Sequence, residues 1–124
     1  MRKLGWRIWC VYTILWTAAL VSPFNGPEEF GGDEVLLGFN LRFLLAKSLH
    51  LLAYTFWTVL TGWLRSPSPG RFFLLFFLMS HAVGTEIAQQ YVEGRHGVLE
   101  DAALDHVGIL IGLIVSWRWW ADND

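Results

Sequence analysis

The stretch FFLLFFLM, residues Phe72–Met79, decides the fold because it is apolar at every position. A helix of a soluble protein keeps a polar face toward water, and this stretch offers none. It belongs to an apolar segment over residues 72–91, whose only charge is Glu86. Similar segments span residues 5–22, 41–64 and 102–120. Each is about 17–24 residues long, which is enough for a helix to cross a hydrocarbon core of about 30 Å.

We therefore predict an all-α fold: a polytopic membrane protein with a four-transmembrane-helix bundle, in a single domain over residues 1–124. The composition agrees, since 54% of the 124 residues are hydrophobic and only 16% are charged. Such a chain is not disordered, because disorder needs low hydrophobicity and high charge. The net charge of -2 gives no nucleic-acid signal. The single cysteine, Cys10, excludes an intrachain disulfide.

The basic residues indicate the orientation in the cell membrane. Six of the nine lie before the first segment, between the second and third, and at the end of the fourth: Arg2, Lys3, Arg7, Arg65, Arg71 and Arg118. The connection over residues 22–40 has no Lys or Arg and is acidic. By the positive-inside rule we expect both termini to be cytoplasmic, with tryptophans forming a belt at that boundary: Trp6, Trp9, Trp63, Trp117, Trp119 and Trp120. The first segment also has the basic start of a signal peptide, but its apolar stretch is long, so we expect an uncleaved helix.

Three of the segments carry polar residues at helical spacing, so each presents one polar stripe. The stripes comprise Lys47, His50 and Tyr54; Glu86, Gln89 and Gln90; and Asp101, Asp105, Gly108 and Gly112. A charge at the centre of a membrane span costs about 2.5–3.5 kcal/mol and normally faces the bundle interior. We expect the stripes to face one another and to form a polar pocket in the outer half of the bundle. The spacing Gly108-x-x-x-Gly112 also predicts a close helix contact.

The helical rise predicts how deep each charge lies. Lys47 and Glu86 are each expected about 9 Å inward from the outer ends of their segments, and therefore level with each other. Asp105 is expected to be shallower, with Arg95 and Asp101 at the mouth of the pocket. The alternative is that Lys47 and Glu86 form one buried ion pair that fixes the helix register.

Metal and cofactor motifs are absent from the sequence. Neither HExxH nor a comparable spacing occurs, and there is no GxSxG, Walker A or dinucleotide fingerprint, so we expect no metal and no cofactor. Among the histidines only His50 lies on the expected pocket face. His81 and His106 are expected on other faces of their helices, and His96 in the outer connection.

With these residues the chain resembles the VanZ-like family of membrane proteins. The resemblance rests on Lys47-x-x-His50-x-x-x-Tyr54, Thr85-Glu86-x-x-Gln89-x-x-x-x-x-Arg95-x-x-x-x-x-Asp101 and Gly108-x-x-x-Gly112. It implies a small four-helix membrane protein whose founding relatives lower susceptibility to the glycopeptide teicoplanin without making altered peptidoglycan precursors. Asp105 departs from the family, which usually has Asn there, and it adds a negative charge to the expected pocket.

Two functions fit this pattern. The first is an envelope protein that binds or shields the headgroup of a membrane lipid or lipid-linked wall precursor, and so lowers glycopeptide susceptibility. Its ligand-binding residues would be Lys47, His50, Tyr54, Glu86, Gln89, Arg95, Asp101 and Asp105. The alternative is an intramembrane acid/base enzyme acting on a lipid-linked substrate, with Glu86, Asp105 or His50 as catalytic candidates. A transporter or channel is a third possibility; four helices are too few for a usual monomeric transporter, so it would require a homo-oligomer. Nucleic acid is not an expected partner.

Overall fold

The computed structural model of the protein describes residues 2–22, 35–36, 39–93 and 99–121. It is dominated by the helices α1 (Arg2–Val21), α2 (Leu41–Trp63), α3 (Ser68–Gln89) and α4 (Leu99–Val115), followed by the short α5 (Trp117–Ala121). Two strands of two residues each, β1 (Val35–Leu36) and β2 (Phe39–Asn40), pair antiparallel just before α2. The all-α prediction is therefore confirmed.

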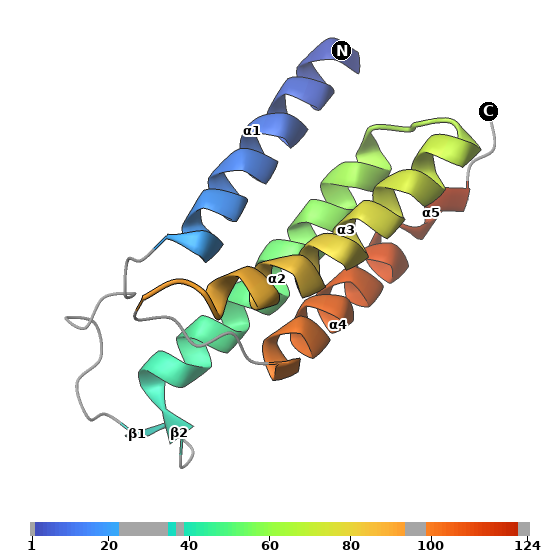
Figure 1. The fold of residues 1–124 in the computed structure, drawn as a ribbon. Helices are drawn as coiled ribbons and strands as arrows, with labels where there is room; N and C mark the ends of the chain where they lie inside the picture. The colour runs from blue at the N-terminus through green and yellow to red at the C-terminus, as the bar shows by residue number, and fades with distance from the viewer. Residues whose placement is uncertain (1, 23–34, 37–38, 94–98, 122–124) are drawn as a thin grey trace.

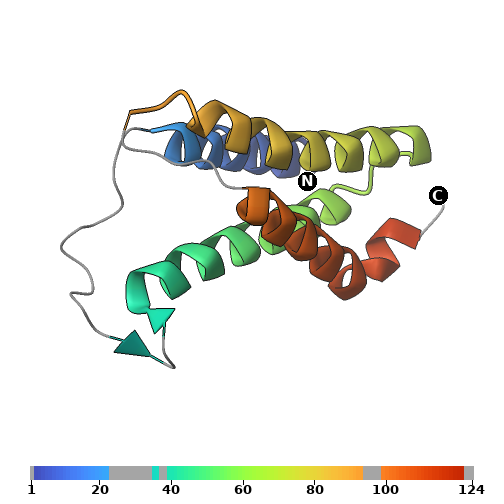
Figure 2. The same ribbon diagram turned by 60° about the horizontal axis from the view of Figure 1, so that its bottom comes forward.

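The four long helices run alternately in opposite directions. The start of α1, the α2–α3 turn and α5 consequently lie at one end of the molecule (Figure 1). Figure 2 shows two layers, with α1 beside α3 in one and α2 crossing α4 in the other. The most extensive helix contact within the described ranges is between α2 and α4. That contact positions the polar residues discussed below.

The turn between α2 and α3 is shorter than the sequence suggests. Helix α3 begins at Ser68 rather than near residue 72, with Pro69 in its first turn. A proline is tolerated there because the N–H that it lacks would have no partner within the helix. Arg65 takes a positive φ of 47° just after α2. A left-handed residue of this kind commonly ends a helix.

The single fourth helix predicted over residues 102–120 is divided in the structure. Helix α4 begins earlier, at Leu99, with Glu100 and Asp101 in its first turn, where the helix dipole favours acidic side chains. It ends at Val115 and is followed by α5. The guanidinium of Arg71 donates a hydrogen bond of 2.6 Å to the carbonyl of Trp120, and so satisfies the end of that last helix.

The outer surface of the bundle is apolar, as the FFLLFFLM stretch illustrates. Phe72 and Phe76 are 72% and 69% exposed, whereas Leu78 on the opposite side of α3 is fully buried. Two helices, over Lys3–Val21 and Ser68–Gln89, are long and apolar enough to cross a membrane, judged by length and composition alone. These features support association with a membrane.

The core beside α1 is aromatic. The rings of Trp9, Trp57 and Phe77 lie within about 6 Å of one another, centre to centre. The indole N–H of Trp9 donates a hydrogen bond of 2.9 Å to Oγ1 of Thr61. Trp9 is therefore buried in the core and does not belong to the expected boundary belt, because α1 turns this face toward α2 and α3.

The close contact between α2 and α4 depends on Gly108 and Gly112. A Cβ atom on Gly108 would lie 2.6 Å from the carbonyl oxygen of Leu51. A Cβ atom on Gly112 would lie 2.7 Å from the carbonyl oxygen of Thr55. The hydroxyl of Thr55 also donates to the carbonyl of Gly108, at 3.1 Å. The predicted close packing at this glycine pair is thus confirmed.

Candidate functional site

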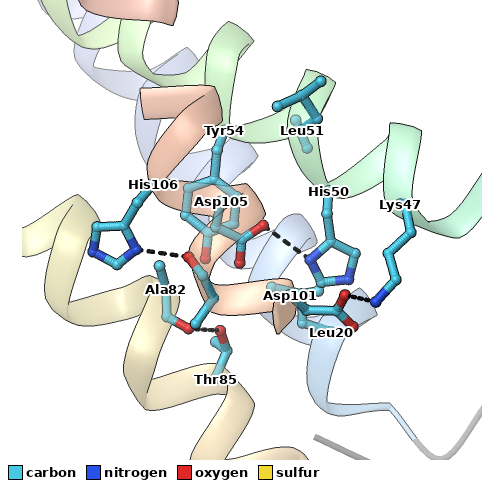
Figure 3. A network of polar contacts seen from close by, with 12 residues as sticks. Leu20, Lys47, His50, Leu51, Tyr54, Ala82, Thr85, Asp101, Asp105 and His106 are labelled. Carbon is cyan, nitrogen blue, oxygen red and sulfur yellow. Dashed lines mark hydrogen bonds and ion pairs between the residues drawn. The ribbon is translucent and has the colours of Figure 1, made fainter. Parts of the chain in front are cut away.

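Two polar pairs join α2 to α4, one helical turn apart (Figure 3). Nζ of Lys47 forms an ion pair with the carboxylate of Asp101. One turn further along each helix, Nδ1 of His50 lies 2.9 Å from Oδ1 of Asp105, a hydrogen-bond distance. The spacings of three residues on α2 and four on α4 keep each pair on the facing sides of the two helices.

Helix α3 adds a third group to this contact. Glu86 is buried, and one of its carboxylate oxygens lies within 4.8 Å of ligand atoms of both His50 and Asp105. These three side chains, which we call the inner cluster, come from α2, α3 and α4. No motif in the sequence marks them as a group, because each helix supplies one donor. The structure nevertheless brings together three side chains that commonly ligate metals.

Exposure falls steeply from one end of this polar contact to the other. The side chains of Lys47 and Asp101 are 19% and 16% exposed, while that of Asp105 is 0% exposed. His50 lies between these values, and Glu86 is buried. The polar contact therefore reaches the surface at the Lys47–Asp101 pair, and its inner cluster is enclosed by the helices.

The expected depths of these residues need correction. Asp105 is level with Glu86 and His50 rather than shallower than Glu86, and Asp101 lies in the first turn of α4 rather than in the preceding connection. Because α4 begins at Leu99, Asp101 is helical and lies at the exposed end of the contact, and Asp105 lies one turn further along α4, beside His50 and Glu86. The ion pair of Lys47 is consequently made with Asp101.

Tyr54 and Gln89, also expected in the pocket, have partners elsewhere. The hydroxyl of Tyr54, which is fully buried, lies 2.8 Å from Nδ1 of His81. Gln89 is buried and its amide donates a hydrogen bond of 3.0 Å to the carbonyl of Leu20. That bond ties α3 to the last turn of α1, so Gln89 contributes to helix packing rather than to the inner cluster.

His81, which the sequence predicts to lie on a different face from the pocket, is part of a second polar contact. Its Nε2 lies 2.8 Å from Oγ1 of Thr17, and its Nδ1 bonds to Tyr54, so it links α1, α2 and α3. His81 does lie on a different face of α3 from Glu86, but the long side chain of Tyr54 on α2 reaches that face. His106 is off the stripe as expected, with Nδ1 2.7 Å from the carbonyl of Ala102 in its own helix.

Two residues of the sequence prediction, Arg95 and His96, lie outside the described residues. Comparison of the chain with protein-family models, with curated proteins and with solved structures finds no match. The proposed function therefore depends on the geometry of the chain itself.

The charges of the site favour a ligand with positive charge or hydrogen-bond donors. Within the described ranges, the contact joins three carboxylates, of Glu86, Asp101 and Asp105, with one ammonium, of Lys47. Among these described residues, carboxylates outnumber the ammonium when His50 is neutral. Buried charges are normally compensated by a partner or a metal ion, since their desolvation is expensive.

Proposed function

We propose that this chain is a four-span integral membrane protein of the cell envelope. Its polar contact binds or shields the headgroup of an envelope lipid or lipid-linked wall precursor. Both termini face the cytoplasm, and the polar contact lies in the outer half of the membrane. The observation that carries the proposal is the charged contact of Lys47, His50, Glu86, Asp101 and Asp105, enclosed by helices whose outer faces are apolar.

The exposed side chains support a lipid environment for all four long helices. Each helix exposes large apolar residues, among them Ile14, Leu15, Leu49, Leu52, Phe73, Phe76, Leu110 and Ile114. In water this surface would cost about 25 cal/mol for each Å² of apolar area, whereas hydrocarbon tails cover it without that cost. Basic residues also gather at the end where α1 begins and α2 turns into α3, which supports a cytoplasmic position for that end.

The Lys47–Asp101 pair is the part of the site that a headgroup would reach first. Its ammonium can bind a phosphate, and its carboxylate can accept hydrogen bonds from an amine, hydroxyl or amide. A headgroup that carries both a phosphate and hydrogen-bond donors could give Lys47 and Asp101 each a new partner in place of the other. Charge would then stay balanced when the pair opens, which favours zwitterionic or hydroxyl-rich headgroups over simple anions.

The resemblance to the VanZ-like family extends this proposal to antibiotic susceptibility. A protein that holds a wall-precursor headgroup would compete with a glycopeptide for it. Expression of the chain in a teicoplanin-sensitive host is therefore expected to raise the inhibitory concentration of teicoplanin. Lys47→Gln and Glu86→Gln should remove that effect while the protein remains in the membrane.

The decisive test is mass spectrometry of lipids and wall precursors that co-purify with the full chain in the presence of a metal chelator. Wild type should enrich a headgroup class that Lys47→Gln and Glu86→Gln do not. Glu100→Gln is the matched control, because Glu100 is exposed in the first turn of α4. The proposal fails if folded variants and wild type carry the same lipids.

A second candidate function, acid/base catalysis on a lipid-linked substrate, is favoured by the His50–Asp105 hydrogen bond. A buried carboxylate that orients an imidazole is a recurring arrangement in general-base catalysis. Its test is turnover: purified wild type should convert an added lipid-linked precursor to a product of different mass, and Asp105→Asn should not. The absence of any product would exclude this function and leave headgroup binding unaffected.

A further inference from the structure

We propose that the inner cluster, His50, Glu86 and Asp105, binds one divalent transition-metal ion of the Zn²⁺ or Mn²⁺ class. Its three ligand atoms lie within 4.8 Å of one another. With bonds of about 2.1 Å, opposite ligands of an octahedral Mn²⁺ ion are about 4.2 Å apart, and any two ligands of a tetrahedral Zn²⁺ ion are about 3.4 Å apart. The longest separation in the cluster therefore has to shorten by about 0.6 Å for an octahedral ion and by at most about 1.4 Å for a tetrahedral one.

The His50–Asp105 pair already has the spacing of neighbouring ligands. Its Nδ1 and Oδ1 atoms are 2.9 Å apart. Two neighbouring ligand atoms at about 2.1 Å from one ion are separated by about 3.0–3.4 Å. An ion can thus take the place of the proton that the two atoms share, with little movement of either helix.

Asp105 supplies a second, independent observation. Its side chain is 0% exposed, and its Oδ2 atom is buried without a hydrogen-bond partner among the described residues. A buried carboxylate oxygen without a donor is expensive, because its hydration is lost and nothing replaces it. A metal ion that accepts one or both oxygens of Asp105 removes that cost.

The two carboxylates among the three ligands suit a dication. Glu86 and Asp105 bring two negative charges to the inner cluster, while the ammonium of Lys47 pairs with Asp101 at the exposed end. A dication would neutralise the two carboxylates and leave His50 neutral, as metal coordination requires. It would also join α2, α3 and α4 at one point.

The ligand set selects the class of ion. Imidazole together with carboxylates suits Zn²⁺, Mn²⁺ and Fe²⁺, whereas Mg²⁺ and Ca²⁺ prefer oxygen alone. Three protein ligands leave at least one coordination position open, as in catalytic rather than structural zinc sites. The inference does not require the headgroup proposal, because the three donors belong to the chain itself.

The test uses the full chain in lipid nanodiscs after treatment with a chelator, and the probes are Zn²⁺ and Mn²⁺ alone. Titration against a chromophoric chelator should give one tight equivalent per chain for wild type. Asp105→Asn and Glu86→Gln should each weaken binding at least about tenfold. Glu100→Gln removes an exposed carboxylate and should leave the affinity unchanged.

A measurement on wild type alone covers the case in which a variant fails to fold. X-ray absorption of the Zn²⁺-loaded protein should give nitrogen and oxygen ligands at about 2.0–2.2 Å, with an imidazole contribution and no sulfur. No bound equivalent in wild type, a sulfur ligand, or wild-type affinity in folded Asp105→Asn would overturn the proposal. The lipid experiment contains a chelator and so tests headgroup binding without metal, and the metal experiment contains no added headgroup. Failure of one proposal therefore leaves the other standing.

Discussion

Substitution of Gly112 by alanine should loosen the contact between α2 and α4. The new Cβ would lie 2.7 Å from the carbonyl oxygen of Thr55 and 2.6 Å from Cβ of Thr58. Ordinary carbon–oxygen contacts begin near 3.3 Å and carbon–carbon contacts near 3.5 Å, so α4 must retreat by about 0.6–0.9 Å. Backbone and Cβ atoms cannot rotate away from the clash. Overpacking of this kind costs about 1–3 kcal/mol.

Gly84→Ala is the matched control, because a Cβ on Gly84 meets nothing within 4 Å. Both substitutions gain the same helix propensity, about 0.5–1 kcal/mol. The difference between them therefore isolates the helix contact. Gly112→Ala is expected to be about 1–3 kcal/mol less stable than Gly84→Ala, measured by reversible unfolding in mixed micelles with increasing SDS. Equal stability of the two variants would refute the close α2–α4 contact.

Three further predictions concern hydrogen bonds and exposure. Thr61→Val should lower the free energy of unfolding by about 1–3 kcal/mol, because it leaves the buried N–H of Trp9 without an acceptor, whereas Thr61→Ser keeps the hydroxyl and should not. Equal free energies of unfolding for the two variants would contradict this. A double-mutant cycle of Tyr54→Phe and His81→Phe should give a coupling of at least about 0.5 kcal/mol across their hydrogen bond, and additive effects would argue against that bond. Cys10 is exposed on α1, so a membrane-impermeant maleimide should label it in SDS but not in sealed vesicles; rapid labelling in vesicles would place it in water.

The sequence predicts the helices well because each depends on its own residues. The run Phe72–Met79 offers no polar face. A helix formed by this run therefore needs apolar surroundings on every side, independently of the rest of the chain. The polar stripes can be found in the same way, since the spacing of Lys47 and His50 fixes a helix face. The pair Gly108 and Gly112 likewise identifies a close contact, although not the partner helix.

The pairing of those stripes could not be predicted from the sequence. Whether Lys47 meets Glu86 or Asp101 depends on where α4 begins and on how it crosses α2. A shift of one turn, about 5.4 Å, changes every partner along the contact. The sequence placed His81 on a different face of α3, and its contacts with Tyr54 on α2 and Thr17 on α1 depend on how the helices pack.

Segment length, helical periodicity and apolar content are local properties, and the chain alone determined them. The meeting of His50, Glu86 and Asp105 was decided only by the tertiary structure, because it requires three helices to be in register at one depth. That register follows from the glycine contact between α2 and α4 and from the packing of α3 against both helices, neither of which any single segment contains.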